Sequence, residues 1–293
     1  MHDHAHGHSH AHHAPVTNLT RTLLIGAGLN IIYVVVEFSM GLHTKSLALV
    51  ADSGHNLSDV AGLLLSLLAF RLARVKSSRT FTYGLRKSTV LASLVNAVLL
   101  LLAVGGILIE SIQRFRHPEP VAGGIVAWVA AVGIVINGAS AFLFFQKKDH
   151  DLNMKGAYLH LLADALVSVG VVAAGVVISY TGWFWLDPAM GMVVAVVILS
   201  GTWQLLADSL RLTLDGVPTG IDLAEVQRVM GSVPGVNTVD HVHIWAMSTT
   251  ENALTAHLTI APDLPGKQVA ALKKEVRHQL EHLNIDHVTL EIN

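Results

Sequence analysis

The chain contains no cysteine, and only 14% of its 293 residues are charged. The lack of cysteine excludes a secreted domain held together by disulfide bonds. Soluble domains carry about 25% charged residues, so the charged share of this chain is about half the usual one. Hydrophobic residues make up 52% of the chain and the net charge is only −2. These values exclude a disordered chain and a nucleic-acid binder with a basic face.

The hydrophobic residues are concentrated in six long stretches. Each has at least 20 residues, which is enough for a helix to cross a hydrocarbon core ~30 Å thick. One such stretch could be a buried helix of a soluble protein, but six in succession predict an α-helical membrane protein with six transmembrane helices. Asp187-Pro188 has the form of an N-cap and first residue of the sixth helix. The expected spans are residues 22–42, 46–70, 88–109, 121–146, 156–186 and 188–207.

Lys and Arg are distributed unevenly between the two sides of these spans. If the N-terminus lies inside, the inner flanks carry 11 basic residues and the outer loops carry three. Cytoplasmic loops of membrane proteins are enriched in Lys and Arg. We therefore expect a multi-pass protein of the inner (plasma) membrane with both termini in the cytoplasm. The basic flanks should also contact the anionic head groups of the lipid bilayer.

The composition changes after the last span, where charged residues return. Two segments have helical periodicity and three alternate as strands do, in the order αββαβ, which predicts a small two-layer α+β domain. The predicted domains are a flexible His-rich leader (1–19), a transmembrane domain (20–214) and a cytoplasmic domain (215–293). In the last, helices are expected at 221–230 and 266–283, and strands at 237–246, 253–260 and 286–292.

Two of the expected spans carry the same pair of ionisable residues. The second contains His55 and Asp59, and the fifth contains His160 and Asp164. Residues four apart lie one turn apart on the same face of a helix. Ionisable groups inside a membrane are costly and usually functional. Each pair could be a buried hydrogen bond between helices, but the occurrence of two pairs favours a shared metal site.

Two imidazoles and two carboxylates suit Zn²⁺, which is usually four-coordinate and tetrahedral. The carboxylates would neutralise the ion, and without metal they would repel each other, so that one becomes protonated. Metal binding would then release protons, which links metal movement to proton exchange. The imidazoles argue against Ca²⁺ and Mg²⁺, and the absence of sulfur ligands argues against Cu(I).

These motifs carry a family resemblance that covers nearly the whole chain after the leader. Residues 46–59 resemble the second-helix signature of the cation diffusion facilitator family, and residues 153–168 resemble its fifth-helix signature. Residues 83–96 are similar to the start of its third helix. Asp187-Pro188 and residues 214–218 also match.

The resemblance implies six membrane helices, a ferredoxin-like cytoplasmic domain and a homodimer. It implies proton-coupled export of divalent metal by alternating access, with His55, Asp59, His160 and Asp164 as the transport site. His at the first of these positions goes with a preference for zinc over cadmium in the family, which favours Zn²⁺. Two alternatives are a membrane-bound metal sensor and an intramembrane zinc metalloenzyme. Four ligands argue against an enzyme, because catalytic zinc keeps an open position.

The chain departs from the family pattern in the loop after the second span. Some members hold a second metal there, but residues 75–84 contain no His, Asp, Glu or Cys, so we expect no metal site in this loop. Thr89 stands where many members carry an acid. The leader is predicted to capture or deliver metal through its histidines, which are His2, His4, His6, His8, His10, His12 and His13. A purification tag is the alternative, and the alternating spacing argues against a contiguous engineered run.

The cytoplasmic domain contains a second candidate metal site. His243 and His257 could bind zinc together with one of Asp286, His287 or Glu291. Such regulatory zinc at the dimer interface is what the resemblance implies. His241 and His243 are expected on the same face of their strand, because they are two residues apart. Surface histidines without a metal are the alternative.

Overall fold

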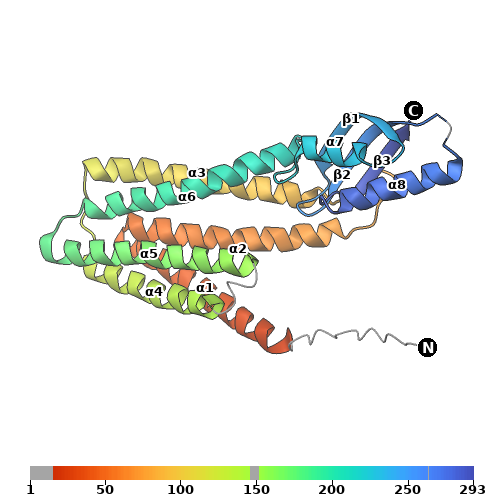
Figure 1. Ribbon diagram of the computed structural model, residues 1–293. Helices are drawn as coiled ribbons and strands as arrows, with labels where there is room; N and C mark the ends of the chain where they lie inside the picture. Colours follow the sequence, from red (N-terminus) through yellow and green to blue (C-terminus); the bar gives the residue numbers. More distant parts are fainter. Residues whose placement is uncertain (1–15, 146–151, 263) are drawn as a thin grey trace. The chain divides into compact units, whose positions relative to one another are not determined.

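A computed structural model describes residues 16–145, 152–262 and 264–293 (Figure 1). For some helical residues within these ranges, including Asp59 and His160, the backbone alone is described. The predicted succession of long helices is confirmed, with bounds that differ by a few residues. The helices are α1 (Val16–Thr44), α2 (Leu47–Ala73), α3 (Ser88–Arg116), α4 (Gly123–Phe145), α5 (Leu152–Thr181) and α6 (Leu186–Thr213).

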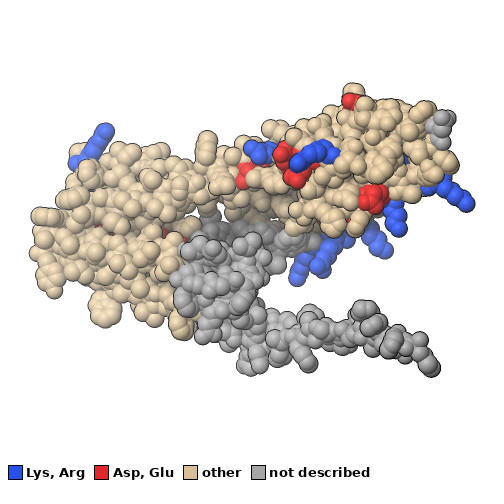
Figure 2. All heavy atoms as spheres, in the orientation of Figure 1, with Lys and Arg blue, Asp and Glu red and all other residues tan. Residues whose placement is uncertain are grey.

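Four described helices are long and apolar enough to cross a membrane. They are the segments Ser88–Arg116, Gly123–Phe142, Leu162–Thr181 and Leu186–Thr213 of α3 to α6. Figure 2 shows few charged side chains along α3 and α6 between their ends. Large apolar side chains such as Leu102 on α3 are exposed instead. The protein is therefore a multi-pass membrane protein, and spanning by α1 and α2 stays a prediction.

The chain forms two compact units. The first contains residues up to Ser53 and Arg114–Met190, and therefore includes α1, α4, α5 and the starts of α2 and α6. The second contains Gly54–Gln113 and Gly191–Asn293, which include most of α2, α3 and α6 and the whole C-terminal domain.

Small residues bring α4 and α5 of the first unit into close contact. A Cβ atom added to Gly123 would lie 2.5 Å from the carbonyl oxygen of Gly175. A Cβ added to Gly175 would lie 2.8 Å from the backbone nitrogen of Ala127. Gly and Ala allow membrane helices to approach this closely, and the gain in packing stabilises the pair.

A polar contact lies between α1 and α4 in the same unit. The Tyr33 hydroxyl donates to Glu37 Oε1 at 2.7 Å and lies 3.3 Å from the carbonyl oxygen of Val129. Glu37 is fully buried. Gly133 leaves room for the Tyr33 ring, because any Cβ there would collide with the hydroxyl. The phenol thus provides a donor for one oxygen of a carboxyl group that would be costly to bury alone.

The connection between α5 and α6 differs from the prediction. The helix expected to continue to residue 186 ends at Thr181, because Gly182 adopts a φ of +69° and terminates it. The α6 helix begins at Leu186, and the Asp187 carboxylate is not the N-cap of that helix. It accepts hydrogen bonds from the backbone N–H of Leu47 (2.6 Å) and from the Ser46 hydroxyl. Asp187 therefore caps the start of α2.

Charged side chains connect the loops at this end of the first unit. The Lys45 ammonium donates to Glu119 at 3.1 Å, and Arg114 donates to the carbonyl oxygen of Lys45 at 2.6 Å. The hydrogen bond and charge of Lys45, followed by the charge of Arg114, lower the pKa of Glu119. The pair is exposed, so its contribution to stability is small.

The predicted αββαβ order of the C-terminal domain is confirmed. The strand order is β1-β2-β3, with β1 and β2 antiparallel and β2 and β3 parallel. Both helices pack on one face of the sheet, where residues such as Val226, Leu254 and Val276 are buried. We call the opposite side the open face. The elements are α7 (Leu223–Gly231), β1 (Val236–Ala246), β2 (Asn252–Ile260), α8 (Gly266–Glu281) and β3 (His287–Ile292).

A bulge in β1 separates His241 from the regular pairing of His243. Asp240 pairs with His257 and His243 pairs with Thr255, so β1 has one more residue than β2 between these pairs. His241 lies in the bulge with a φ of +49°. Both histidines nevertheless lie on the open face, because His243 pairs with Thr255 and the His241 ring lies beside His257. The expectation that they share a face is confirmed, although an inserted residue interrupts the alternation between them.

Candidate metal sites

The two H-x-x-x-D motifs lie within unbroken helices. His55 and Asp59 are in α2, and His160 and Asp164 are in α5. In each pair the residues are one turn apart, about 6 Å along the helix axis. Asp164 is buried and His55 is half-buried. The side chains of Asp59 and His160 lie outside the described part of the structure.

Two contacts define how the start of α2 lies against α5 and α6. The Ser168 hydroxyl of α5 donates to Asp52 Oδ2 of α2 at 3.1 Å, and both side chains are buried. The second is the contact of Asp187, beyond the end of α5, with Leu47 at the start of α2. Residue 47 of α2 therefore contacts residue 187, and residue 52 contacts residue 168, which comes earlier in the chain. The α2 and α5 helices are antiparallel here.

In the C-terminal domain, two of the predicted ligands are brought together. His257 and Glu291 are paired across β2 and β3, and the atoms Nε2 and Oε2 lie 3.4 Å apart. The His241 ring lies beside the His257 ring, with 4.8 Å between their centroids. His257 and Glu291 have the opposite parity to Leu254 and Leu258 of the core, so they lie on the open face.

Two further predicted ligands, His287 and His243, have different neighbours. His287 pairs with Ala253, four residues along the strand from the His257–Glu291 pair, which corresponds to about 13 Å. Its ring contacts Tyr83 edge to face, with 5.5 Å between centroids. His243 lines a separate cavity that also includes Asp215. The structure does not bring His287 or His243 to Glu291.

The sequence named His241 beside the candidate site without assigning it as a ligand, and the structure places its ring against His257. The bulge places its ring beside His257, and alternation of polar and apolar residues contains no signal for such an insertion. Among the side chains that the structure describes, no three His, Asp or Glu groups lie close enough to hold a metal ion. The leader histidines of residues 1–15 lie outside the described residues.

Comparisons with known proteins decide the family. Residues 23–213 match the cation efflux transmembrane domain, and residues 218–293 match the cytoplasmic domain of cation efflux proteins. The chain belongs to the cation efflux (cation diffusion facilitator) family. The resemblance found in the sequence is thereby confirmed. This cation efflux protein is a membrane transporter of metal cations and not an enzyme.

Several bacterial relatives share nearly the full length. The zinc transporter ZitB of Escherichia coli is 37% identical over 96% of this chain and 89% of its own length. The cadmium, cobalt and zinc/H(+)-K(+) antiporter of Bacillus subtilis is 33% identical over 89% of this chain and 84% of its own. The metal cation efflux system protein CzcD of Cupriavidus metallidurans is 35% identical over 92% and 85%, respectively.

Proposed function

We propose that this cation efflux protein exports Zn²⁺ from the cytoplasm in exchange for protons, by alternating access. His55, Asp59, His160 and Asp164 are the proposed transport site. The observation that carries the proposal is the hydrogen bond between Ser168 and Asp52, which joins α2 to α5 one turn from both motifs.

The helix register supports convergence of the four ligands. In an antiparallel pair, a step forward along α2 matches a step backward along α5. Three residues beyond Asp52 is His55, and four residues before Ser168 is Asp164. One further turn on each helix reaches Asp59 and His160. At about 1.5 Å per residue, the two motifs lie at similar distances along their own helices from the contact between Ser168 and Asp52.

Zn²⁺ is the ion that this donor set fits best. Two neutral imidazoles and two carboxylates complete a tetrahedral, electrically neutral site, which lowers the cost of holding a divalent ion away from water. Relatives with the names zinc transporter and cadmium, cobalt and zinc antiporter support a soft-to-borderline divalent ion. Cd²⁺ and Co²⁺ are competing substrates to be tested beside Zn²⁺.

The same carboxylates provide the link to protons. In the metal-free site two nearby anions repel each other, and a proton on one of them relieves the repulsion. Zn²⁺ binding displaces that proton, and protons from outside displace Zn²⁺ in turn. The name antiporter of the Bacillus subtilis relative supports exchange. We further propose a homodimer with both termini in the cytoplasm, in agreement with the distribution of basic residues.

Zinc uptake into inside-out membrane vesicles tests the exchange. An acidic lumen should drive accumulation, because each exchanged proton contributes about 1.4 kcal/mol per pH unit, a tenfold change in the accumulation ratio. A protonophore that makes the lumenal and external pH equal should abolish the accumulation and leave only the flux of zinc down its own concentration gradient. Vesicles without the protein serve as the control. Zinc accumulation that is unaffected by the pH gradient would contradict proton exchange.

We also propose that the open face of the C-terminal domain binds regulatory zinc. His257 and Glu291 are the central ligands, with His241 as a third and the partner copy in a homodimer completing the site. Their contact at 3.4 Å supports the pairing. His287, which contacts Tyr83 instead, is not included.

Zinc stoichiometry tests this site in full-length protein that carries Asp59→Ala and Asp164→Ala. His257→Ala should lower the number of tightly bound zinc ions by up to one per chain, measured by equilibrium dialysis and metal analysis. His278→Ala is the matched control, because His278 is an exposed histidine of α8 that faces Glu281 at 3.8 Å. Equal zinc content in the two variants would show that His257 is not a ligand.

A further inference from the structure

A cavity of about 590 Å³ lies within the second unit, beside the membrane helices. Its walls are the end of α2, the loop that follows, the first turn of α3 and the turn between β1 and β2. The charged residues that line it are Arg74, Lys76, Arg86 and Glu251. Neither of the two proposed metal sites uses this space. Its lining includes His287 at the start of β3 and Glu251 in the turn between β1 and β2.

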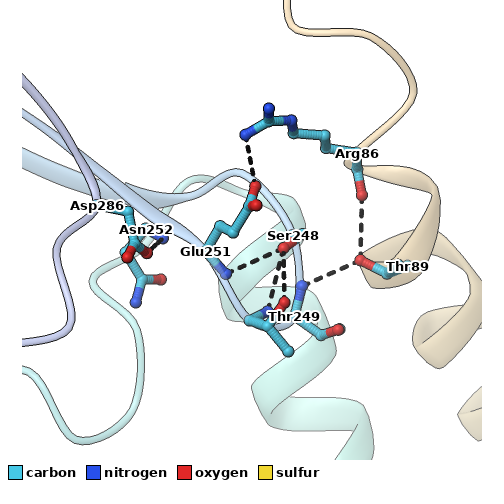
Figure 3. Close-up of polar contacts among 8 residues, drawn as sticks. Arg86, Thr89, Ser248, Thr249, Glu251, Asn252 and Asp286 are labelled. Atoms are coloured by element: carbon cyan, nitrogen blue, oxygen red, sulfur yellow. Dashed lines mark hydrogen bonds and ion pairs between the residues drawn. The ribbon is translucent and has the colours of Figure 1, made fainter. Parts of the chain in front are cut away.

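The wall shared with the C-terminal domain is held by directed hydrogen bonds (Figure 3). The backbone N–H of Thr249 donates to Thr89 Oγ1 at 3.0 Å, and Thr89 Oγ1 donates to the carbonyl oxygen of Arg86 at 3.1 Å. Arg86 pairs with Glu251 at 2.6 Å. The Ser248 hydroxyl accepts from the backbone N–H of Glu251 at 3.0 Å, which fixes the turn. This side of the cavity is therefore preorganised.

The side chains that line the cavity carry a net positive charge, which Glu251 neutralises only in part. Three cationic side chains face one carboxylate, and Glu251 is already paired with Arg86. Within the described part of the chain, Arg74 and Lys76 form no ion pair. Hydroxyls of Ser77 and Thr82 also line the space. Guanidinium, ammonium and hydroxyl donors that converge in this way suit phosphate oxygens.

The position of the cavity decides which phosphate is expected. It lies where α2 ends at Ala73 and α3 begins at Ser88, and α3 is one of the helices able to cross the membrane. Head groups are concentrated at this level, and an anionic leaflet attracts Lys and Arg side chains that lie near it. A free phosphate in solution lacks this local concentration.

We propose that this cavity binds the phosphate of an anionic phospholipid head group, with Arg74 and Lys76 as the main ligands. The bound head group contacts both the loop after α2 and the turn between β1 and β2. It thereby anchors the C-terminal domain to the membrane surface. The proposal rests on the membrane location of α3 and not on the identity of the transported ion.

Native mass spectrometry of the full-length protein in detergent tests the site. Phosphatidylglycerol should remain bound in the presence of excess phosphatidylcholine, which is zwitterionic. The double substitution Arg74→Gln and Lys76→Gln should weaken phosphatidylglycerol binding at least tenfold. The matched control is Lys274→Gln with Arg277→Gln, two exposed basic residues of α8, and this variant should bind as the unchanged protein does.

Other results would overturn the proposal. Equal loss of binding in the two double variants would mean that general surface charge attracts the lipid. Displacement of phosphatidylglycerol by inorganic phosphate at the same concentration would assign the cavity to a soluble anion. The measurement is made without zinc and repeated with Asp59→Ala, in which lipid binding should be unchanged. A failure of the lipid site is therefore distinguishable from a failure of the transport proposal.

Discussion

Replacing Asp59 by alanine is expected to reduce zinc uptake into inside-out vesicles to background, a loss of roughly 100-fold or more. Loss of residues that merely support metal ligands typically costs about 10–100-fold, and a direct ligand should cost more. The change removes one of four donors and also one of two negative charges. The remaining site would hold Zn²⁺ with a net positive charge in a poorly solvated environment, which is unfavourable.

The control for this experiment is Asp208→Ala, which removes an acid from another long helix. Asp208 accepts a hydrogen bond from Thr219 at 2.9 Å and lies outside both motifs, so uptake should be retained. Each variant is checked for an unchanged elution profile and melting temperature. A metal sensor that used only the C-terminal domain would keep its zinc response in Asp59→Ala. Uptake that persists when all four ligands are alanine would show that the transport site lies elsewhere.

Replacing Gly123 by alanine is expected to destabilise the membrane domain, whereas the same change at Gly124 is expected to be harmless. The new Cβ at Gly123 would lie 2.5 Å from the carbonyl oxygen of Gly175 and 2.8 Å from the backbone nitrogen of Ser179. Backbone atoms of a helix cannot move aside as a side chain can, so α4 and α5 would have to separate. Overpacking of this kind costs about 1–3 kcal/mol.

Gly124 is a closely matched control, because it is the next residue of α4 and a Cβ there would meet no atom within 4 Å. Alanine is favoured over glycine in helices by up to about 1 kcal/mol, so Gly124→Ala should be neutral or slightly stabilising. The melting temperature in detergent is the measurement. Similar melting temperatures for the two variants would mean that α4 and α5 are not in backbone contact at Gly123.

Features that depend on local composition were predictable from the sequence. The long apolar stretches predicted the membrane helices, because a bilayer requires continuous apolar surface and internally bonded backbone. The alternating segments after residue 215 predicted the strands of the C-terminal domain, because side chains of a strand alternate between the two faces of a sheet. The paired motifs with His55 and His160 were visible because four residues make one helical turn.

Features that depend on a partner distant in the chain were not predictable. Asp187 has the local form of an N-cap, and nothing near it indicates that its carboxylate bonds to Leu47. Likewise, the bulge at His241 inserts one residue into a strand whose alternation looks regular. Both were missed because local patterns report which face a residue occupies, whereas caps and bulges depend on what the fold places opposite.

The cap supplied by Asp187 has a consequence for biogenesis. The first N–H groups of α2 need an acceptor, and the carboxylate that accepts from Leu47 lies 140 residues later. At about 5–20 residues per second, synthesis of that interval takes roughly 7–30 s. During this time the start of α2 must rely on water, lipid head groups or the insertion machinery. The cap of α2 therefore forms only after residue 187 has been made, and chains truncated before that residue should leave the start of α2 exposed to membrane quality-control proteases.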